Sequence, residues 1–198
     1  MKPALLAALV IAPFSSHAGQ AQSAVAAAPA SPTLGGAPVS GVCLLSRPAV
    51  FATAKVGVAA TARLQQLTEQ AKAEVEAERK PIEADAKAFQ AEQARLSPEL
   101  RQSRAQALEQ RLHAVQQKAA LRAREIEATR DKVTARVITV LQPLVAQAYQ
   151  ARGCGLLIDR GSVLGGNMAN DLTSTVIQGL DTKMTSISFD REVLATAQ

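Results

Sequence analysis

Aromatic side chains are scarce in this sequence. It has no Trp, one Tyr and four Phe among 198 residues, although 47% of the residues are hydrophobic. The apolar share is therefore mostly Ala, Val and Leu, which suit narrow seams between helices better than a thick globular core. The scarcity also argues against the aromatic platforms on which single-stranded nucleic acid stacks.

Residue types used in catalysis are also few. Two His leave little material for a histidine-built metal site or a catalytic triad. Gly165-Gly166 follows an apolar run but lacks the Lys-Ser/Thr pair that completes a phosphate-binding loop. Asp159 is expected to end a strand and Asp171 to cap a helix. The sequence therefore predicts a binding or structural protein with no enzyme activity, no cofactor and no metal.

The amino terminus has the pattern of a signal peptide. Lys2 precedes an apolar run over residues 3–14, which is shorter than the roughly 20 residues that a transmembrane helix needs. Small residues follow, and they predict a signal peptide over 1–18, or alternatively over 1–21. The opposing interpretation is an uncleaved membrane anchor. Cleavage would give an exported, periplasmic protein, and loss of Lys2 would lower the net charge of +5 by one.

A linker and a first strand are predicted next. Residues 19–40 are rich in Ala, Pro, Ser and Gly and carry no charged side chain. Such a composition predicts a disordered linker, with a periplasmic tether as the alternative. The apolar run over residues 41–45 follows, and Ser46-Arg47-Pro48 closes it as a short strand.

The middle of the chain is strongly helical. Two long segments rich in Ala, Gln, Glu, Lys and Arg are separated by Ser97 and Pro98, which fit the cap and the first residue of a new helix. Gly153 ends the second segment. The pattern predicts an antiparallel helical hairpin, a coiled-coil arm over 58–152 with its tip near 96–98. At 1.5 Å per residue such an arm is about 60–75 Å long.

Both predicted helices carry thin apolar stripes. A helix with such a stripe cannot bury itself and must pack against a partner. Pro81 and Pro143 are expected to kink the two helices. The second stripe has the spacing of a coiled coil: Leu108, Leu112, Val115, Ala119, Ile126, Val133, Val137, Val140 and Leu144. In the first helix, acidic residues alternate with the stripe at the companion positions: Val75, Ile82, Phe89 and Leu96 against Glu78, Asp85 and Glu92.

The last part of the chain predicts a second strand and a short helix. Residues 155–159 are a short apolar run, and a helix is expected from Asp171 to Leu180 with Asn170 or Asp171 as its cap. Residues 185–189 alternate between apolar and polar and would add an edge strand. The expected fold is mainly α with a small β-body (α+β), in which the hairpin is inserted between the strands of a small sheet. The body would comprise residues 41–57 and 153–198.

Residues at the two ends of the hairpin form a pattern. Before the arm they are Gly41-Val42, Val50-Phe51, Val56-Gly57 and Leu64. After the arm they are Pro143-Leu144-Val145, Gly153, Leu156-Leu157-Ile158-Asp159, Asp171-Leu172-Thr173, Val176-Ile177 and Leu180. The pattern resembles the Skp/OmpH family of periplasmic chaperones for outer-membrane proteins, and the resemblance covers residues 41 to about 183.

The resemblance implies a homotrimer shaped like a jellyfish, in which a small β-body holds three helical arms around a cavity. It also implies that unfolded outer-membrane proteins are held in that cavity without ATP. The basic charge would favour peripheral contact with an anionic membrane or lipopolysaccharide. A functional nucleic-acid partner is not expected, because the signal peptide removes the chain from DNA and no recognition motif is present.

Positive charge is concentrated on the second predicted helix. Residues 98–152 contain ten basic and five acidic residues, whereas residues 63–96 contain six basic and seven acidic residues. The basic residues are either client-binding groups or the solvated face of a coiled coil. For the whole protein, the alternative is a structural periplasmic scaffold or secretion adaptor without chaperone activity. The residues predicted to bind clients are Arg101, Arg104, Arg111, Lys118, Arg122, Arg124, Arg130 and Lys132.

Two Cys lie on either side of the predicted arm. Cys43 belongs to the first predicted strand and Cys154 opens the second, in a compartment that permits disulfides. If the strands are adjacent and parallel, the two residues lie at the same end of the sheet and can bond. The alternative is two separate buried thiols.

Overall fold

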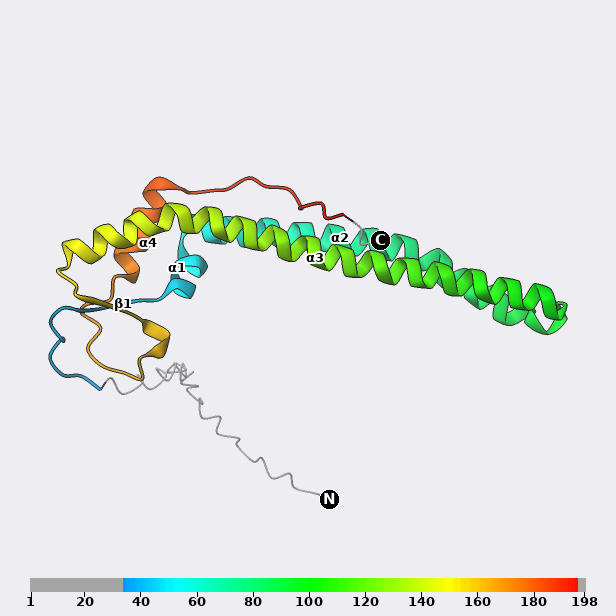
Figure 1. Cartoon of the computed structure of the whole chain (residues 1–198), viewed down its shortest axis with the longest axis horizontal. Coiled ribbons are helices and arrows are strands. Elements are labelled where there is room, and N and C mark those ends of the chain that lie inside the picture. Colours follow the sequence, from blue (N-terminus) through cyan, green and yellow to red (C-terminus); the bar gives the residue numbers. More distant parts are fainter. Residues whose placement is uncertain (1–33, 196–198) are drawn as a thin grey trace, which may run out of the picture. The chain divides into compact units, whose positions relative to one another are not determined.

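A computed structural model describes residues 34–195 of the chain (Figure 1). The predicted signal peptide and most of the predicted linker lie outside the described residues. Within this part, no helix is both long enough and apolar enough to cross a membrane. The elements in order are β1 (Val42–Leu45), α1 (Arg47–Thr53), α2 (Lys55–Glu92), a 3-10 turn (Gln93–Arg95), α3 (Pro98–Ala151), β2 (Leu156–Asp159), a second 3-10 turn (Arg160–Ser162) and α4 (Thr173–Lys183).

The sheet has two parallel strands, β1 and β2, in the described part of the chain. Their register pairs Val42 with Leu156 and Leu45 with Asp159. Parallel strands need a long crossover connection, and here the two long helices supply it. On the other side of β1, Leu44 forms an isolated bridge with Asp171. The start of α4 is therefore fixed to the sheet.

A short helix, α1, follows β1 where the sequence analysis expected only the end of a strand. The Ser46 side chain accepts a hydrogen bond from the backbone N–H of Ala49, and a Pro stands in the first turn. These are the cap and first-turn signals that begin helices. The chain then turns sharply into α2 at Lys55, so that helix begins three residues earlier than predicted. A Cβ on Gly57 would lie 1.9 Å from the carbonyl oxygen of Phe51, so only glycine fits at this corner.

The two long helices, α2 and α3, lie side by side and together form what is called the arm below (Figure 1). Ser97 caps α3 by accepting the N–H of Leu100, and a Pro stands in its first turn. Both helices continue as single helices past Pro81 and Pro143, the residues expected to kink them. A proline ring removes one backbone donor, and the remaining ladder is long enough to keep each helix intact.

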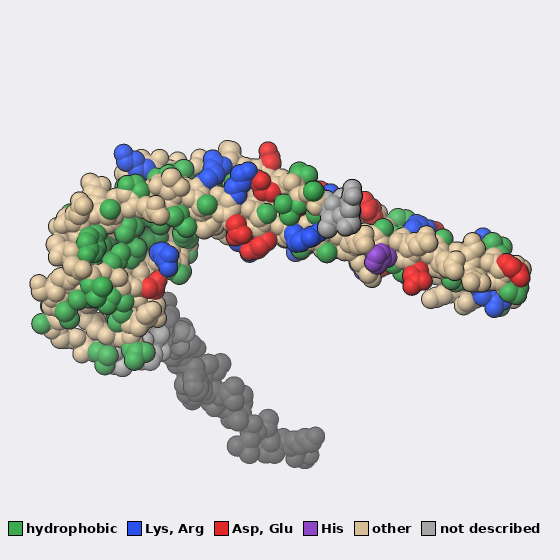
Figure 2. All heavy atoms as spheres, viewed as in Figure 1, with side chains coloured by type: hydrophobic (Ala, Val, Ile, Leu, Met, Phe, Trp, Pro, Cys, Tyr) green, Lys and Arg blue, Asp and Glu red, His purple; other side chains and the backbone are tan. Residues whose placement is uncertain are grey.

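The main hydrophobic core lies at the base of the arm. It combines side chains from β1, α1, both arm helices and α4, and the largest fully buried apolar side chain is Leu180. Figure 2 shows apolar side chains gathered at this end of the molecule. The core residues are Cys43, Leu45, Val50, Ala54, Val56, Val137, Leu141, Ala148, Leu172, Val176 and Leu180.

Asp171 ties the start of α4 to the body. The helix begins at Thr173, two residues later than predicted, but the Asp171 carboxylate accepts hydrogen bonds from the Thr173 N–H at 2.8 Å and the Thr173 hydroxyl at 2.5 Å. Its other oxygen pairs with Arg160 at 2.9 Å. Burial raises the pKa of Asp171, but the hydrogen bonds from Thr173 and the Arg160 charge outweigh it, so the pKa lies below its usual value.

The segment after α4 is not a strand, and the predicted edge strand around residues 185–189 is wrong. Residues 185–195, called the tail below, form no strand or helix and return along the arm (Figure 1). Phe189 packs against the seam between α2 and α3 instead of joining the sheet. The alternating pattern correctly indicates an extended segment, but this segment packs on the arm and not on the sheet.

A disulfide joins Cys43 and Cys154, which the sequence had left open between a bond and two thiols. The two Cα atoms are 5.8 Å apart, and the cysteines are 111 positions apart in the chain. The bond closes the crossover at the base of the arm and leaves the tip unconstrained. It acts mainly by restricting the unfolded chain, and a loop of this length corresponds to about 5 kcal/mol of unfolding free energy.

Replacing both cysteines in a Cys43→Ala/Cys154→Ala variant should lower the free energy of unfolding by up to about 5 kcal/mol. Alanine avoids placing a polar group at Cys43, which is buried. Urea titration followed by circular dichroism measures the change, and wild type in reductant should unfold at nearly the same urea concentration as the variant. An oxidised wild type no more stable than the variant would contradict the assignment.

Candidate functional site

The seam between α2 and α3 is narrow and only partly apolar. Apolar residues of both helices are buried in it: Leu67 and Ala71 on α2, and on α3 the predicted stripe residues Val115, Ile126 and Val133. Others are not covered: Ala119 is exposed and Leu112 keeps 39% of its surface. A seam of this kind holds two helices together but leaves grooves on either side of the contact line.

A ladder of ion pairs runs along the arm where the apolar stripe is weak. From the tip toward the base, successive pairs are seven, seven and four residues apart in both helices. The residue numbers rise along α3 while they fall along α2. Its pairs are Arg104–Glu92 at 3.1 Å, Arg111–Asp85 at 2.6 Å, Lys118–Glu78, and Arg122–Glu74 at 2.7 Å. Three of the acidic partners are the residues that interrupt the first predicted stripe. α2 and α3 therefore run antiparallel.

Most of the predicted client-binding cations already have a partner within the chain. Besides the four in the ladder, Arg130 pairs with Glu127 and Lys132 with Glu192 of the tail. Arg101 donates to the carbonyl oxygens of Gln93 and Leu96 at the tip. For Arg124, no carboxylate of residues 34–195 lies within ion-pair distance.

The arm is thus not a bare basic surface, and Figure 2 shows basic and acidic side chains interspersed along it. Where a cation pairs with a carboxylate on α2, the two opposite charges largely cancel each other's electrostatic potential at long range. Such exposed pairs contribute little to stability and break at small cost. The positive excess of α3 is therefore not an open patch. An acidic ligand would bind these cations by replacing the α2 carboxylates as their ion-pair partners.

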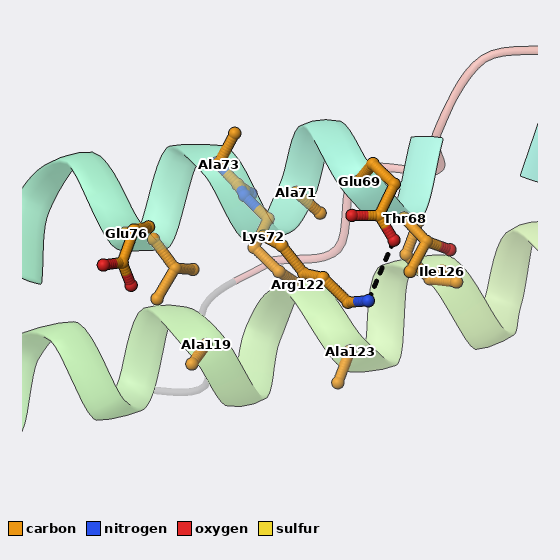
Figure 3. A pocket seen from close by; sticks show the side chains of 11 residues that line it. Thr68, Glu69, Ala71, Lys72, Ala73, Glu76, Ala119, Arg122, Ala123 and Ile126 are labelled. Atoms are coloured by element: carbon orange, nitrogen blue, oxygen red, sulfur yellow. Dashed lines mark hydrogen bonds and ion pairs between the residues drawn. The ribbon is translucent and has the colours of Figure 1, made fainter. Parts of the chain in front are cut away.

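One groove of the arm is open and lined mainly by small side chains (Figure 3). Its volume is about 760 Å³. Alanines stand on both helices, so the walls are low and the floor reaches the buried seam residue Ile126. The arrangement suits apolar side chains of an extended partner, with charged side chains of both signs at its margin. The lining residues are Thr68, Glu69, Ala71, Lys72, Ala73, Val75, Glu76, Ala119, Arg122, Ala123 and Ile126.

The opposite groove of the arm is filled by the tail. At 100° per residue, the α2 residues that contact the tail, Arg63 and Glu74, lie on the other side of the seam from Thr68 and Lys72. Figure 3 accordingly shows the tail running behind the two helices when the open groove faces the reader. We call the covered side the tail groove. The arm thus has one open and one occupied groove at the same height.

An acidic pair lies under the tail, and one of its two carboxylates is buried. Glu125 on α3 is only 1% exposed, and Glu74 on α2 faces it. Arg191 of the tail lies 3.0 Å from Glu74 and 3.2 Å from Glu125, and Arg122 pairs with both carboxylates. The hydrogen bond from Arg191 is the main cause that holds the pKa of Glu74 below its usual value, against burial, which raises it. The buried charge is therefore compensated partly by the tail itself.

Sequence reasoning missed this acidic pair and the tail residues that meet it. Glu125 stands next to Ile126 in a seam where apolar residues were sought, and Glu74 looked like a solvated charge. The one available signal was compositional, because Phe189 is one of only four Phe in the chain and stands two residues before Arg191. Nothing in the sequence says that these residues lie beside Glu74, which is 117 positions from Arg191.

Comparison with known proteins identifies the family. The sequence model of the family described as "Outer membrane protein (OmpH-like)" matches residues 41–180. A solved structure of an OmpH-like protein from Caulobacter crescentus, described as a candidate outer membrane chaperone, is 36% identical. The similarity covers 80% of this chain and 94% of that one, with a TM-score of 0.70. No curated protein sequence matches. The chain therefore belongs to the OmpH-like family.

Proposed function

We propose that this protein is an ATP-independent periplasmic chaperone that holds unfolded outer-membrane proteins and prevents their aggregation. Family membership carries the proposal, since the matched structure is described as a candidate outer membrane chaperone and the match covers nearly all of that chain. The arm supplies the physical means. Its open groove presents a long, low-walled apolar surface, and its ion pairs exchange partners at small cost.

Weak contacts spread over a long arm are suited to many different clients. A deep pocket selects one ligand by shape, whereas a shallow groove lined by Ala and Thr accepts any small apolar side chain. The cations of α3 attract acidic segments of a client. Their carboxylate partners on α2 compete with those segments and so lower the affinity of the arm for anions. The eight basic residues predicted on α3 are the charged part of this surface.

We further propose that three chains assemble through the body. Leu156 on β2 is 53% exposed, and Leu157 and Ile158 are only half-buried, although they are large apolar residues. A hollow of about 370 Å³ beside them is lined by Leu45, Leu141 and Val145 among others. β2 has one strand neighbour within the described residues, so its outer edge is available for pairing with another copy.

The chaperone proposal predicts that aggregation is suppressed without ATP. A urea-unfolded outer-membrane β-barrel protein is diluted into buffer with one trimer equivalent of this protein, and light scattering is followed. Scattering should fall to a small fraction of the level seen without the protein, with or without added nucleotide. Scattering that stays at the level without the protein would reject the holding function and leave the structural scaffold as the remaining interpretation.

Two variants locate the effect on the arm. Ala119→Glu/Ala123→Glu places charge in the open groove at exposed positions and should weaken suppression several-fold. Gln117→Glu adds charge on an exposed position of α3 outside that groove and should leave suppression unchanged. Equal behaviour of the two variants would show that clients do not use this groove.

Assembly is tested separately by light scattering coupled to size-exclusion chromatography. Wild type should elute at three times the monomer mass, and Leu156→Asp should shift the protein toward monomer because it places a charge at the proposed edge contact. Leu112→Asp, a similar exchange far out on the arm, should leave the trimer intact. A wild-type monomer at tens of micromolar would refute the assembly.

A further inference from the structure

The arm holds the tail partly by its main chain. Two carbonyl oxygens of the tail accept hydrogen bonds from arm arginines: Ser188 from Arg136 at 3.2 Å, and Phe189 from Arg63 at 3.2 Å. Two tail amides donate to arm side chains: Glu192 to the Thr129 hydroxyl at 2.9 Å, and Leu194 to the Glu125 carboxylate at 3.4 Å. Every polypeptide carries these backbone groups, so four of the contacts do not depend on the tail's side chains.

Four tail side chains add to this backbone recognition. Glu192 pairs with Lys132 at the surface of the arm. Phe189 packs against Leu67, Ala71 and Ile126. Arg191 reaches the acidic pair of Glu74 and Glu125. In an extended segment alternate side chains share a face, and the Asp190 side chain between them is accordingly 95% exposed, with Arg63 as its surface ion-pair partner at 3.0 Å. The tail groove therefore accepts an apolar residue and, two positions later, a basic one.

The tail groove contains a buried carboxylate that a bound segment helps to compensate. Glu125 is buried at a seam position, where a carboxylate is costly unless cationic and hydrogen-bonding partners surround it. Arg122 supplies one partner, and the tail supplies an Arg191 charge and a backbone amide. The family sequence model ends at residue 180, so the tail lies outside the residues that it matches, while the arm lies within them.

We propose that the tail groove is a binding site for extended polypeptide segments, and that the chain's own tail occupies it as an internal competitor. The ligand class is an unfolded chain that presents its backbone together with an apolar residue followed two positions later by Lys or Arg. This inference relies on the proposed chaperone function only for the natural source of that chain. Attachment gives the tail an effective concentration in the millimolar range, so weak external ligands are excluded and strong or multivalent ones displace it.

The test uses the full chain and a defined probe. The probe is a fluorescein-labelled peptide with the sequence of residues 185–195, and its binding is followed by fluorescence anisotropy. In Phe189→Ala/Arg191→Ala the internal tail loses the two side chains that reach the seam and the buried carboxylate and keeps only its surface ion pairs, so the groove should become available. We expect the released variant to bind the probe at least tenfold more tightly than wild type does.

Matched controls separate the groove from general stickiness. In the released variant, an additional Arg63→Ala/Arg136→Ala exchange removes the donors to the backbone and should reduce probe binding at least tenfold. An additional Lys72→Ala exchange, in the open groove, should leave it unchanged. A second probe with Ala in place of its own Phe and Arg should bind more weakly but measurably. Circular dichroism checks that every variant keeps the helical content of wild type.

The outcome that overturns the proposal is a released, folded variant that binds the probe no better than wild type. The aggregation assay is run on the same variants so that the two proposals fail separately. Suppression of aggregation without tighter probe binding would remove the groove and leave the chaperone function. Tight probe binding without suppression would establish the groove and remove the chaperone function.

Discussion

The arm can exist only because it is fixed at its base. Its helices face each other through a seam so thin that alanines and ion pairs take up much of it, and exposed ion pairs contribute little free energy. Long helices of this kind are stabilised by tertiary packing rather than by intrinsic propensity. The packing is supplied at one end, where α1, α4 and the sheet enclose the last turns of α3 around Leu141 and Leu180. The Cys43–Cys154 bond closes the same end covalently.

The thin seam between α2 and α3 leaves apolar surface of the arm free to bind a partner. A thick apolar seam would bury its side chains and leave nothing for a partner. A thin seam leaves a groove on each side, one open and lined by small residues and one filled by the tail. The ion-pair ladder keeps the helices in register without hiding apolar surface. Both grooves are therefore consequences of the composition that makes the sequence poor in aromatic residues and rich in alanine.

Helix caps and short apolar runs predicted the helices and strands whose start depends on residues close by in the sequence. Ser97 and Pro98 marked the start of α3, and the apolar runs marked β1 and β2. The same signals at Ser46 and Pro48 would have revealed α1, but they were interpreted as the end of a strand. The acidic companions Glu78, Asp85 and Glu92 were visible in the heptads, although their partners on α3 were not assigned. Periodicity indicates which face of a helix is polar and does not say which charge lies opposite.

The tail could not be predicted for a different reason. Alternation over residues 185–189 is compatible with any extended segment, and an extended segment takes its partner from long-range packing. The contacts that place the tail, from Phe189 to Leu67 and from Arg191 to Glu74, join positions more than a hundred residues apart. The buried Glu125 was equally invisible, because a charged residue in a seam acquires meaning only when its counter-charge is known.

The most direct measurement of the central claim is hydrogen exchange of the full chain, with and without an equimolar unfolded outer-membrane β-barrel protein. The account predicts that slowed exchange on binding appears along α2 and α3, where the open groove lies. It also predicts faster exchange at the Glu192 and Leu194 amides, because a bound client displaces the tail from Thr129 and Glu125. Exchange along the arm and tail that does not change, with protection limited to the body or absent altogether, would contradict it.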